Sequence, residues 1–416
     1  MHAILNRLFR SHSLLLAAAV IVLFFTAESA TAQNRVQFEK MRHGMVQEVL
    51  VEGGIKDERV IEAFRQTPRH EFIAVEHRKN AYYDMSLPIG EHQTISSPFI
   101  VAYMTQSLDT KPTDKVLEIG TGSGFQAAIL SPLVKEVYSI EIVEQLAKSA
   151  ERTLKRLGYK NVFTKAGDGY LGWPEHAPFD KIIVTCSPEE VPQPLVDQLR
   201  EGGVIVIPVG ERFRQTLYLM RKKDGKLEKE VLLPTLFVPM TGKAEDNRRV
   251  KPDPANPRLV NGSFEEQAFK SGAQPGWYYE KQIAWEESTS APDGKRVLTF
   301  ENSRPGLSAH LLQAFAIDGR QVKHLEVSGW ITTKEIVADV KREEAPVIAL
   351  TLYDASRREM GHQFIGPVIT DADWHELKRT FKIPETAREG ILRIGLFGAT
   401  GTASFDKLQI RKVEPK

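Results

Sequence analysis

Two short segments, close together in the chain, have residue types that could perform chemistry. Gly120, Gly122 and Gly124 follow an apolar stretch, Val116–Ile119, and precede the start of a helical pattern. Glycines at such a turn let the backbone approach a ligand closely, where a side chain would clash. The second segment, Gln93–Pro98, is polar and lies just upstream. We expect a ligand loop beside a polar site that holds a second reactant.

The spacing of the glycines indicates which ligand the loop binds. It is G-x-G-x-G, whereas dinucleotide sites have G-x-G-x-x-G, and an acidic residue lies inside the preceding strand. Both details favour S-adenosylmethionine over NAD. A tight turn without a ligand is the alternative. The predicted cofactor contacts in this segment are Glu118, Gly120, Thr121, Gly122, Ser123 and Gly124.

Two acidic positions further along extend this prediction. Glu141 ends the next apolar strand, Val137–Ile140, where a carboxylate can accept hydrogen bonds from both ribose hydroxyls. Asp168 and Gly169 follow another short strand, and the Asp168 carboxylate is placed to accept from the adenine amino group. A solvated strand-end glutamate and an ordinary Asp-Gly turn are the corresponding alternatives.

The segments between these positions predict the fold that holds them. From Asn34 to about Gly242, helical and strand-like stretches alternate, which is typical of a parallel sheet covered by helices. The stretch Val143–Leu157 has apolar residues at helical spacing, and Gly158 is a natural stop. We therefore predict a doubly wound, Rossmann-like α/β domain over residues 33–242.

The wider pattern resembles the class I methyltransferases and, more closely, the protein-L-isoaspartate O-methyltransferase family. The stretches that carry this resemblance span about half of the chain and are Tyr83-Asp84, Leu87–Gly90, Gln93–Pro98, Val116–Gly124, Gly167–Gly169, Gly172–Pro174, Leu199–Gly210 and Val238–Gly242. The resemblance implies S-adenosyl-L-methionine as cofactor and damaged, isoaspartyl-containing proteins as substrates. It implies Ser96 as the active-site serine, with Asp84, Gln93, Thr94 and Ile95 in the substrate-binding region.

The chemistry of such a transfer can be argued from the residues themselves. A carboxylate with a pKa of about 4 is already ionised near neutral pH, so its methyl esterification needs no strong base. The enzyme must instead position and desolvate the reactants. The Ser96 hydroxyl can donate a hydrogen bond that fixes the acceptor carboxylate. Alternatively, Ser96 and Ser97 are only turn or cap residues before Pro98.

Composition excludes several other classes of function. The chain has 416 residues, 42% of them hydrophobic, and a formal net charge of +1. This length predicts two domains, and the balanced charge argues against nucleic acid as a partner. Cys186 is the only cysteine and is expected to be a small buried hydrophobe. Because the sequence has no Cys/His cluster, we predict no metal site.

The character of the sequence changes after Gly242. Residues 243–257 are rich in charge and proline and predict a linker. Residues 258–416 have short β-rich stretches separated by polar turns, which predicts an all-β sandwich. Its ends, Leu259–Glu265 and Ala403–Ile410, resemble galactose-binding-like jelly rolls of carbohydrate-binding modules. The aromatic residues that could stack on a saccharide or a peptide, or simply form the core, are Trp277, Tyr278, Tyr279, Trp330 and Trp374.

The N-terminus predicts the compartment. Arg7 and Arg10 precede an apolar run, Leu14–Phe25, and Ala30-Thr31-Ala32 is a typical cleavage site before Gln33. We expect residues 1–32 to be a signal peptide and the mature protein to be exported, monomeric and without a stable membrane span. The alternatives are an uncleaved anchor, a wrongly assigned start codon, or a cytoplasmic location, as is usual for the family.

Two other functions stay open at this point. One is a binding protein with an inactive methyltransferase-like domain, whose β-sandwich binds a carbohydrate or a protein. The other is a methyltransferase that acts on a different carboxylate.

Overall fold

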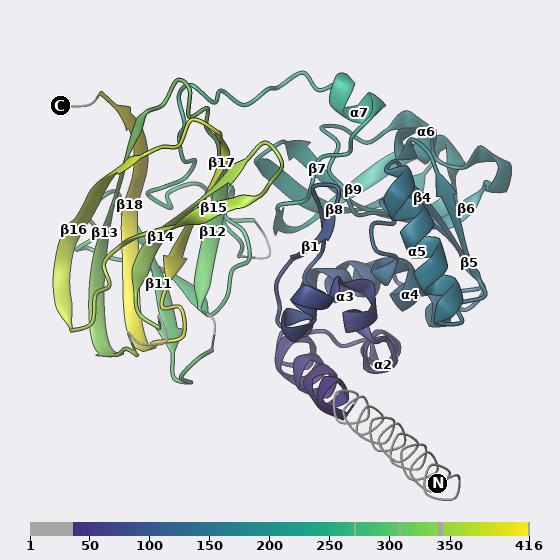
Figure 1. Cartoon of the computed structure of the whole chain (residues 1–416), viewed down its shortest axis with the longest axis horizontal. Helices are drawn as coiled ribbons and strands as arrows, with labels where there is room; N and C mark the ends of the chain where they lie inside the picture. Colours follow the sequence, from purple (N-terminus) through teal and green to yellow (C-terminus); the bar gives the residue numbers. More distant parts are fainter. Residues whose placement is uncertain (1–35, 270–271, 308, 340–343, 415–416) are drawn as a thin grey trace, which may run out of the picture.

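The computed structural model describes residues 36–269, 272–307, 309–339 and 344–414. It has an N-terminal α/β region and a C-terminal all-β region, which lie side by side (Figure 1). The predicted signal peptide lies outside the described residues. Among those described, no helix is long and apolar enough to cross a membrane.

A seven-stranded sheet is the centre of the α/β region, with the order β5-β4-β3-β6-β7-β8-β9. The first five strands of this order are parallel, and β8 and β9 extend the sheet as antiparallel strands. The bounds are β3 Lys115–Ile119, β4 Glu136–Glu141, β5 Val162–Ala166, β6 Phe179–Val184, β7 Leu199–Glu211, β8 Arg214–Lys223 and β9 Lys226–Thr235. The prediction of a doubly wound α/β fold is confirmed. The short apolar runs of the inner strands β3, β4 and β6 are buried on both faces, as such a sheet requires, whereas the edge strand β5 is partly exposed.

The helices of this region are mostly short. They are α2 Glu58–Gln66, α3 Pro98–Ser107, α4 Phe125–Leu130, α5 Glu144–Arg156, α6 Gln193–Gln198 and α7 Lys243–Asp246, and residues 36–45 are also helical. A π-helix covers Val46–Val51, and 3₁₀ turns cover Arg69–Phe72, Val75–Asn80, Ser131–Leu133, Gly169–Leu171 and Pro174–His176. Asp57 caps the N-terminus of helix α2, and its side chain accepts a hydrogen bond from the Arg59 backbone N–H.

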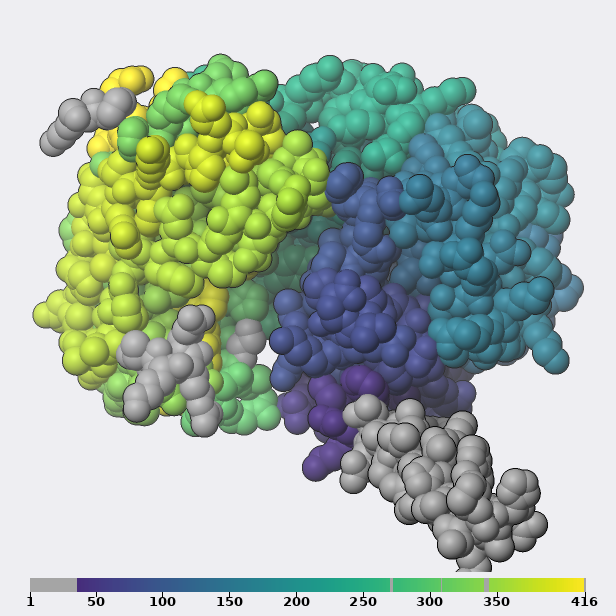
Figure 2. Space-filling model, viewed as in Figure 1, coloured from purple at the N-terminus to yellow at the C-terminus, as the bar shows by residue number. Residues whose placement is uncertain are grey.

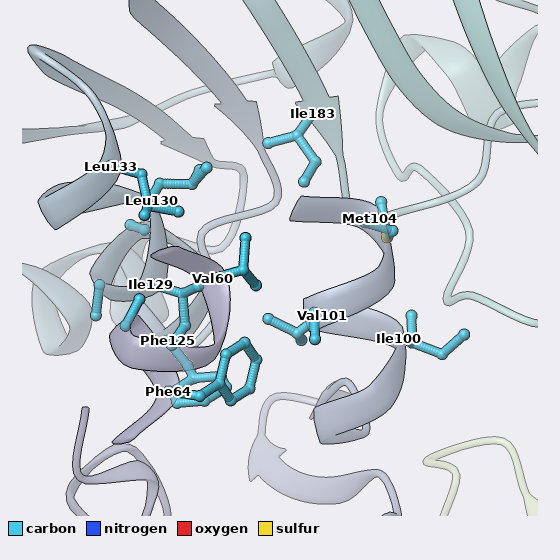
Figure 3. Packing of buried hydrophobic residues seen from close by; sticks show 14 of the residues in the cluster. Val60, Phe64, Ile100, Val101, Met104, Phe125, Ile129, Leu130, Leu133 and Ile183 are labelled. Atoms are coloured by element: carbon cyan, nitrogen blue, oxygen red, sulfur yellow. The ribbon is translucent and has the colours of Figure 1, made fainter. Parts of the chain in front are cut away.

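A hydrophobic cluster fixes α2, α3 and α4 relative to the sheet (Figure 3). The Phe64 and Phe125 rings lie edge to face with centroids 5.8 Å apart. Val101 and Met104 of α3 belong to the same cluster as Ile183 of β6. Because α4 begins at the glycine loop and α3 begins just after Ser96, this cluster positions both chemical segments.

A small hairpin carries the polar segment. Strand β1, Leu87–Gly90, pairs with β2, Gln93–Ile95, in a separate two-stranded sheet. Glu91 and His92 form its turn with positive φ angles of 51° and 60°. Pro98 then opens α3, where its missing N–H costs nothing.

Two antiparallel sheets make up the C-terminal region, with orders β10-β11-β18-β13-β16 and β12-β17-β14-β15. Their strands are β10 Ile283–Glu287, β11 Arg296–Asn302, β12 His310–Ala316, β13 His324–Val337, β14 Val347–Asp354, β15 Glu359–Ile365, β16 Ala372–Lys382, β17 Ala387–Gly395 and β18 Thr400–Val413. One apolar cluster includes residues of both sheets, such as Leu325 of β13 and Leu392 of β17. The prediction of an all-β region is therefore confirmed.

For two of the aromatic residues, the structure decides between a stacking platform for a ligand and a place in the core. Trp277 and Tyr278 are fully buried, with 0% and 1% exposure, so they are core residues and provide no stacking platform. The Trp277 indole N–H donates to the Asn261 carbonyl, which explains how a buried indole is satisfied. The Tyr278 hydroxyl donates to the Phe213 carbonyl of the α/β region.

The predicted linker differs from expectation in its first residues. Helix α7 lies within it, and the Arg248 guanidinium donates to the Gly210 carbonyl at 2.9 Å and to the Ser187 carbonyl at 3.1 Å. These residues therefore belong to the α/β region. Charge and proline content alone predicted exposed chain here. That content gives no sign of the Arg248 contacts, because the Gly210 and Ser187 carbonyls lie far away in the sequence.

Candidate active site

A cavity lies at the carboxyl ends of β3, β4 and β6, the edge where open α/β sheets bind ligands. The glycine loop contributes Gly120, Thr121, Gly122 and Ser123 to its lining, and the hairpin segment contributes Gln93, Thr94, Ile95 and Ser96. Glu141, Gly169 and Cys186 also line it, with Val238–Thr241. The tertiary structure thus brings together the two segments that the sequence singled out.

Backbone conformation explains the first and last glycines of the loop. Gly120 has φ of 97°, and a Cβ there would lie 2.5 Å from the Thr185 Oγ1. The Thr185 hydroxyl donates to the Gly120 carbonyl at 2.7 Å. Gly124 has φ of 88° and precedes α4, and its Cβ would lie 3.1 Å from a Leu154 methyl group. A side chain at either position would combine backbone strain with a close contact.

Glu141 organises the loop from the end of β4. Its Oε2 accepts from the Gly122 N–H at 2.8 Å, and its Oε1 accepts from the Val143 N–H at 3.0 Å. Each carboxylate oxygen keeps further acceptor capacity toward the cavity that Glu141 lines. This position fits the predicted acceptor for vicinal hydroxyls.

Glu118 has a different place from the other predicted cofactor residues. Its side chain is fully buried and does not line the cavity. Its Oε2 accepts from the Ser139 hydroxyl at 2.6 Å, and Ser139 lies 2.6 Å from the Thr121 hydroxyl. Burial raises the pKa of Glu118 to about 8; the Ser139 hydrogen bond opposes this shift, and the Glu141 charge adds to it. Glu118 therefore contacts the glycine loop through Ser139 and Thr121, on the side away from the cavity.

Asp168 also occupies a supporting position. Its Oδ1 accepts from the Tyr170 N–H at 2.9 Å, and its Oδ2 accepts from the Lys243 N–H at 3.0 Å. Gly169, next to it, lines the cavity, whereas Asp168 is not among the lining residues. The predicted contact of Asp168 with the adenine amino group stays a prediction.

The two adjacent serines face different spaces. Ser96 lines the cofactor-loop cavity, and Ser97 lines a larger cleft between the α/β region and the C-terminal region. Gln93 and Thr94 line both. Ser97 is 1% exposed, and its hydroxyl has no hydrogen-bond partner among the described residues. A hydroxyl that donates a hydrogen bond, together with the polar segment Gln93–Ser96, can hold a carboxylate between the cavity and the cleft.

Asp84 lies in the cleft rather than in the cofactor-loop cavity. Its Oδ1 accepts from the Phe99 N–H at 2.9 Å, at the start of α3. Its Oδ2 is 2.5 Å from the Lys281 ammonium of the C-terminal region. The sequence analysis missed Lys281 because it lies 197 residues from Asp84 and belongs to no motif.

The cavity can be tested against the cofactor that the loop predicts. The glycines, the carboxylate of Glu141 and the hydroxyls of Thr121 and Ser123 suit the amino acid and ribose groups of S-adenosylmethionine. The cavity volume is about 80 Å³, below the ~300 Å³ or more of typical small-molecule sites. The residues therefore fit the cofactor chemically, in a cavity that is narrow in this structure.

Two other chemistries have no support at this site. Burial raises the pKa of the Cys186 thiol, which disfavours the nucleophilic thiolate. Within the described part of the chain, no group of three or more His, Cys, Asp or Glu residues could hold a metal ion.

Comparison with known proteins agrees with this geometry. The profile of the family described as Protein-L-isoaspartate(D-aspartate) O-methyltransferase (PCMT) matches residues 40–245. The protein-L-isoaspartate O-methyltransferase of Opitutus terrae is 50% identical over 224 residues, which are 54% of this chain and 95% of that relative. That of Dictyoglomus turgidum is 49% identical over 203 residues, 49% of this chain and 92% of the relative.

Several solved structures resemble the same half of the chain. One is a putative protein-L-isoaspartate O-methyltransferase of Plasmodium falciparum in complex with S-adenosyl-L-homocysteine, 26% identical, with a TM-score of 0.44 over 48% of this chain and 98% of that one. The sequence relatives match at high identity over nearly their whole length. This chain therefore belongs to the protein-L-isoaspartate(D-aspartate) O-methyltransferase family.

Proposed function

We propose that this protein uses S-adenosyl-L-methionine to methylate the α-carboxylate of L-isoaspartyl residues in damaged proteins. The observation that carries this function is the junction at Gln93–Ser96, where the family's polar segment lines the same cavity as the glycine loop. A backbone amide nitrogen can then attack the ester carbonyl and expel methanol to form a succinimide, which water hydrolyses in part to normal aspartate.

The protein's own residues position the acceptor. When bound, the cofactor supplies an electrophilic methyl group, held by Gly120–Ser123 and Glu141. The Ser96 hydroxyl donates a hydrogen bond to the carboxylate, and Gln93 and Thr94 are placed to donate from the cleft side. Fixing both reactants in this way can lower the barrier by several kcal/mol without a general base.

The direct test uses matched peptides. The protein without residues 1–32 is incubated with methyl-labelled S-adenosylmethionine and with two peptides that differ only in an aspartyl or isoaspartyl linkage. We expect base-labile label in the isoaspartyl peptide alone. Equal labelling of both peptides would indicate a methyltransferase for another carboxylate, and absence of cofactor binding would indicate an inactive domain.

We also propose that the protein is exported. The charged, apolar and small-residue segments within residues 1–32 support this location. A reporter that is active only outside the cytoplasm, fused after residue 40, is expected to be active, and the same fusion without residues 1–32 inactive. Activity of neither fusion would favour the cytoplasmic alternative.

For the C-terminal region, we propose a sandwich of the galactose-binding-like kind in a monomeric protein. The two sheets and their common core support this architecture. A carbohydrate or another surface ligand is the partner that the sequence resemblance implies. Calorimetry with soluble polysaccharides tests the proposed carbohydrate ligand. The molecular mass in solution tests the proposed monomer.

A further inference from the structure

A large hollow lies between the α/β region and the C-terminal region. Its volume is about 2560 Å³, more than twice the ~1,000 Å³ upper range of small-molecule pockets. Figure 2 shows a recess between the C-terminal lobe and the segment that carries the hairpin. A single isoaspartyl residue needs only a small part of this space.

The cleft is continuous with the candidate active site. Gln93 and Thr94 line both the cleft and the cofactor-loop cavity, and Ser97 lines the cleft with a buried hydroxyl that has no hydrogen-bond partner among the described residues. A molecule in the cleft therefore lies against residues that also line the cofactor-loop cavity. The occupant is most simply the rest of the molecule whose carboxylate is methylated.

One wall of the cleft is the outer face of the sheet β12-β17-β14-β15. Residues alternate along β14: Ala349, Thr351 and Tyr353 line the cleft, and Ile348, Leu350 and Leu352 belong to the core. The lining residues form an ordered polar layer. The Arg393 guanidinium donates to the Thr351 hydroxyl at 2.7 Å, and the His362 Nδ1 lies 2.9 Å from the same hydroxyl.

Exposed apolar side chains occur on both walls. Tyr83 and Met85 on the α/β side are 60% and 43% exposed, and Phe364 on β15 is 40% exposed. Large apolar side chains that face one another across a cleft indicate a partner with apolar groups. The charges of the lining have both signs, for example Arg357 paired with Glu389 at 3.4 Å, which disfavours a polyanion.

The hairpin offers backbone hydrogen-bonding groups to the same space. Within the described residues, β1 and β2 pair only with each other, and residues of both line the cleft. A strand edge of this kind can pair with an extended polypeptide. A saccharide would not use such an edge in the same regular way.

Contacts between the regions hold the two walls in place. The Asp84–Lys281 ion pair is accompanied by the Arg304–Glu52 pair at 3.0 Å. His92 at the hairpin turn has its Nδ1 2.7 Å from the Ser356 carbonyl. The sheet wall is thus fixed directly opposite the hairpin.

From these observations we infer that the cleft binds an extended polypeptide segment, the sequence that flanks the isoaspartyl residue, and that the C-terminal region forms half of the binding surface. This inference rests on the proposed function. It predicts that several residues on either side of the damaged position contribute to affinity, whatever their detailed sequence.

The test compares two isoaspartyl peptides with the same centre, one of about 6 residues and one of about 20. For the full mature protein, we expect KM for the long peptide to be at least ~10-fold lower. Phe364→Ser, on the sheet wall, and Tyr83→Ser, on the opposite wall, should each raise the long-to-short KM ratio ~10-fold. The matched control is Val337→Ser, because Val337 is 69% exposed in the same region and does not line the cleft.

A second measurement does not depend on methyl transfer. Fluorescence anisotropy of the labelled long peptide should show binding that Phe364→Ser weakens ~10-fold and Val337→Ser leaves unchanged. If that pattern appears without methylation, the proposed function fails and the cleft inference stands. Equal KM values for both peptides would overturn the inference, as would unchanged binding in both cleft variants. Binding of a neutral polysaccharide by a protein that does not bind the peptide would overturn it as well.

Discussion

At the scale of single residues, Ser96 is the residue on which the proposed transfer depends most. Ser96 is half-buried and lines the cofactor-loop cavity, whereas its neighbour Ser97 is buried on the cleft side. Adjacent residues of the sequence thus line two different spaces. The hydrogen bond from Ser96 should matter mainly when the acceptor is being aligned.

Replacing this serine tests that role. Ser96→Ala should lower kcat ~10²-fold and change the Kd for S-adenosylmethionine less than ~3-fold, because the hydroxyl acts on the acceptor. Single-turnover kinetics and calorimetry measure the two quantities. Equal losses in both would contradict the assignment and indicate a damaged cavity.

Glu118 gives a second prediction, on pH. Its folded-state pKa of about 8 lies above the usual value of 4.5, so the unfolded chain releases the proton first. The free energy of unfolding should therefore fall as the pH rises from about 4.5 to about 8. Glu118→Gln should remove part of this slope, which is at most ~1.4 kcal/mol per pH unit for one proton.

Urea unfolding at pH 5, 6.5 and 8 measures this effect. The control is Glu151→Gln, an exposed change on α5, which should leave the slope as it is. A slope that is the same in the Glu118→Gln variant and in the unsubstituted protein would show that Glu118 is ionised in the folded state.

At the scale of elements, the β3–α4 connection is the part that the sequence describes most completely. The apolar strand, the three glycines and the following helix all occur as predicted. Local backbone geometry dictates this turn, so sequence pattern suffices to find it. Its contact with Thr185, which directly follows the neighbouring strand β6, is a tertiary feature.

The close packing of the loop predicts the effect of a methyl group. Gly120→Ala should cost ~2–4 kcal/mol of stability and lower cofactor affinity at least ~10-fold, since backbone strain adds to the contact with Thr185. Gly158→Ala is the matched control: its φ is 84°, and a Cβ there meets nothing within 4 Å. The control should cost only ~1–2 kcal/mol. Denaturant unfolding measures the loss of stability, and calorimetry measures the loss of cofactor affinity. Equal effects of Gly120→Ala and Gly158→Ala would show that the contact with Thr185 adds nothing to the backbone strain.

At the scale of the whole molecule, the C-terminal region is attached to the active-site side of the α/β region. Lys281 pairs with Asp84, whose other oxygen caps the start of α3 directly after the serine segment. The Asp84 side chain is 6% exposed, and that of Lys281 is 27% exposed. A nearly buried carboxylate thus depends on a cation from the other region.

Removing that cation should destabilise the protein. Lys281→Ala should cost ~1–3 kcal/mol, less than a fully buried pair because Lys281 is partly exposed. Lys323→Ala is the control, since its pair with Glu385 has side chains 47% and 76% exposed, and it should cost less than ~1 kcal/mol. Equilibrium unfolding in urea measures both. Equal costs would show that Asp84 does not depend on Lys281.

The sequence by itself determined the doubly wound fold, the glycine loop, the polar segment with Ser96 and the change to an all-β region. Each of these depends on local pattern, namely strand and helix periodicity, glycine spacing and turn residues. Motif position alone could not show that Glu118 and Asp168 support the site without lining it, because burial depends on what packs above them.

The tertiary structure alone decided which distant parts meet. It placed Trp277 and Tyr278 in the core, joined α7 to the α/β region, and set the outer face of the β12-β17-β14-β15 sheet opposite the hairpin. These outcomes depend on contacts between residues far apart in the chain, for which no short-range pattern exists. The physical reason is that ion pairing, burial and cleft shape arise from packing of whole elements, which only the folded chain specifies.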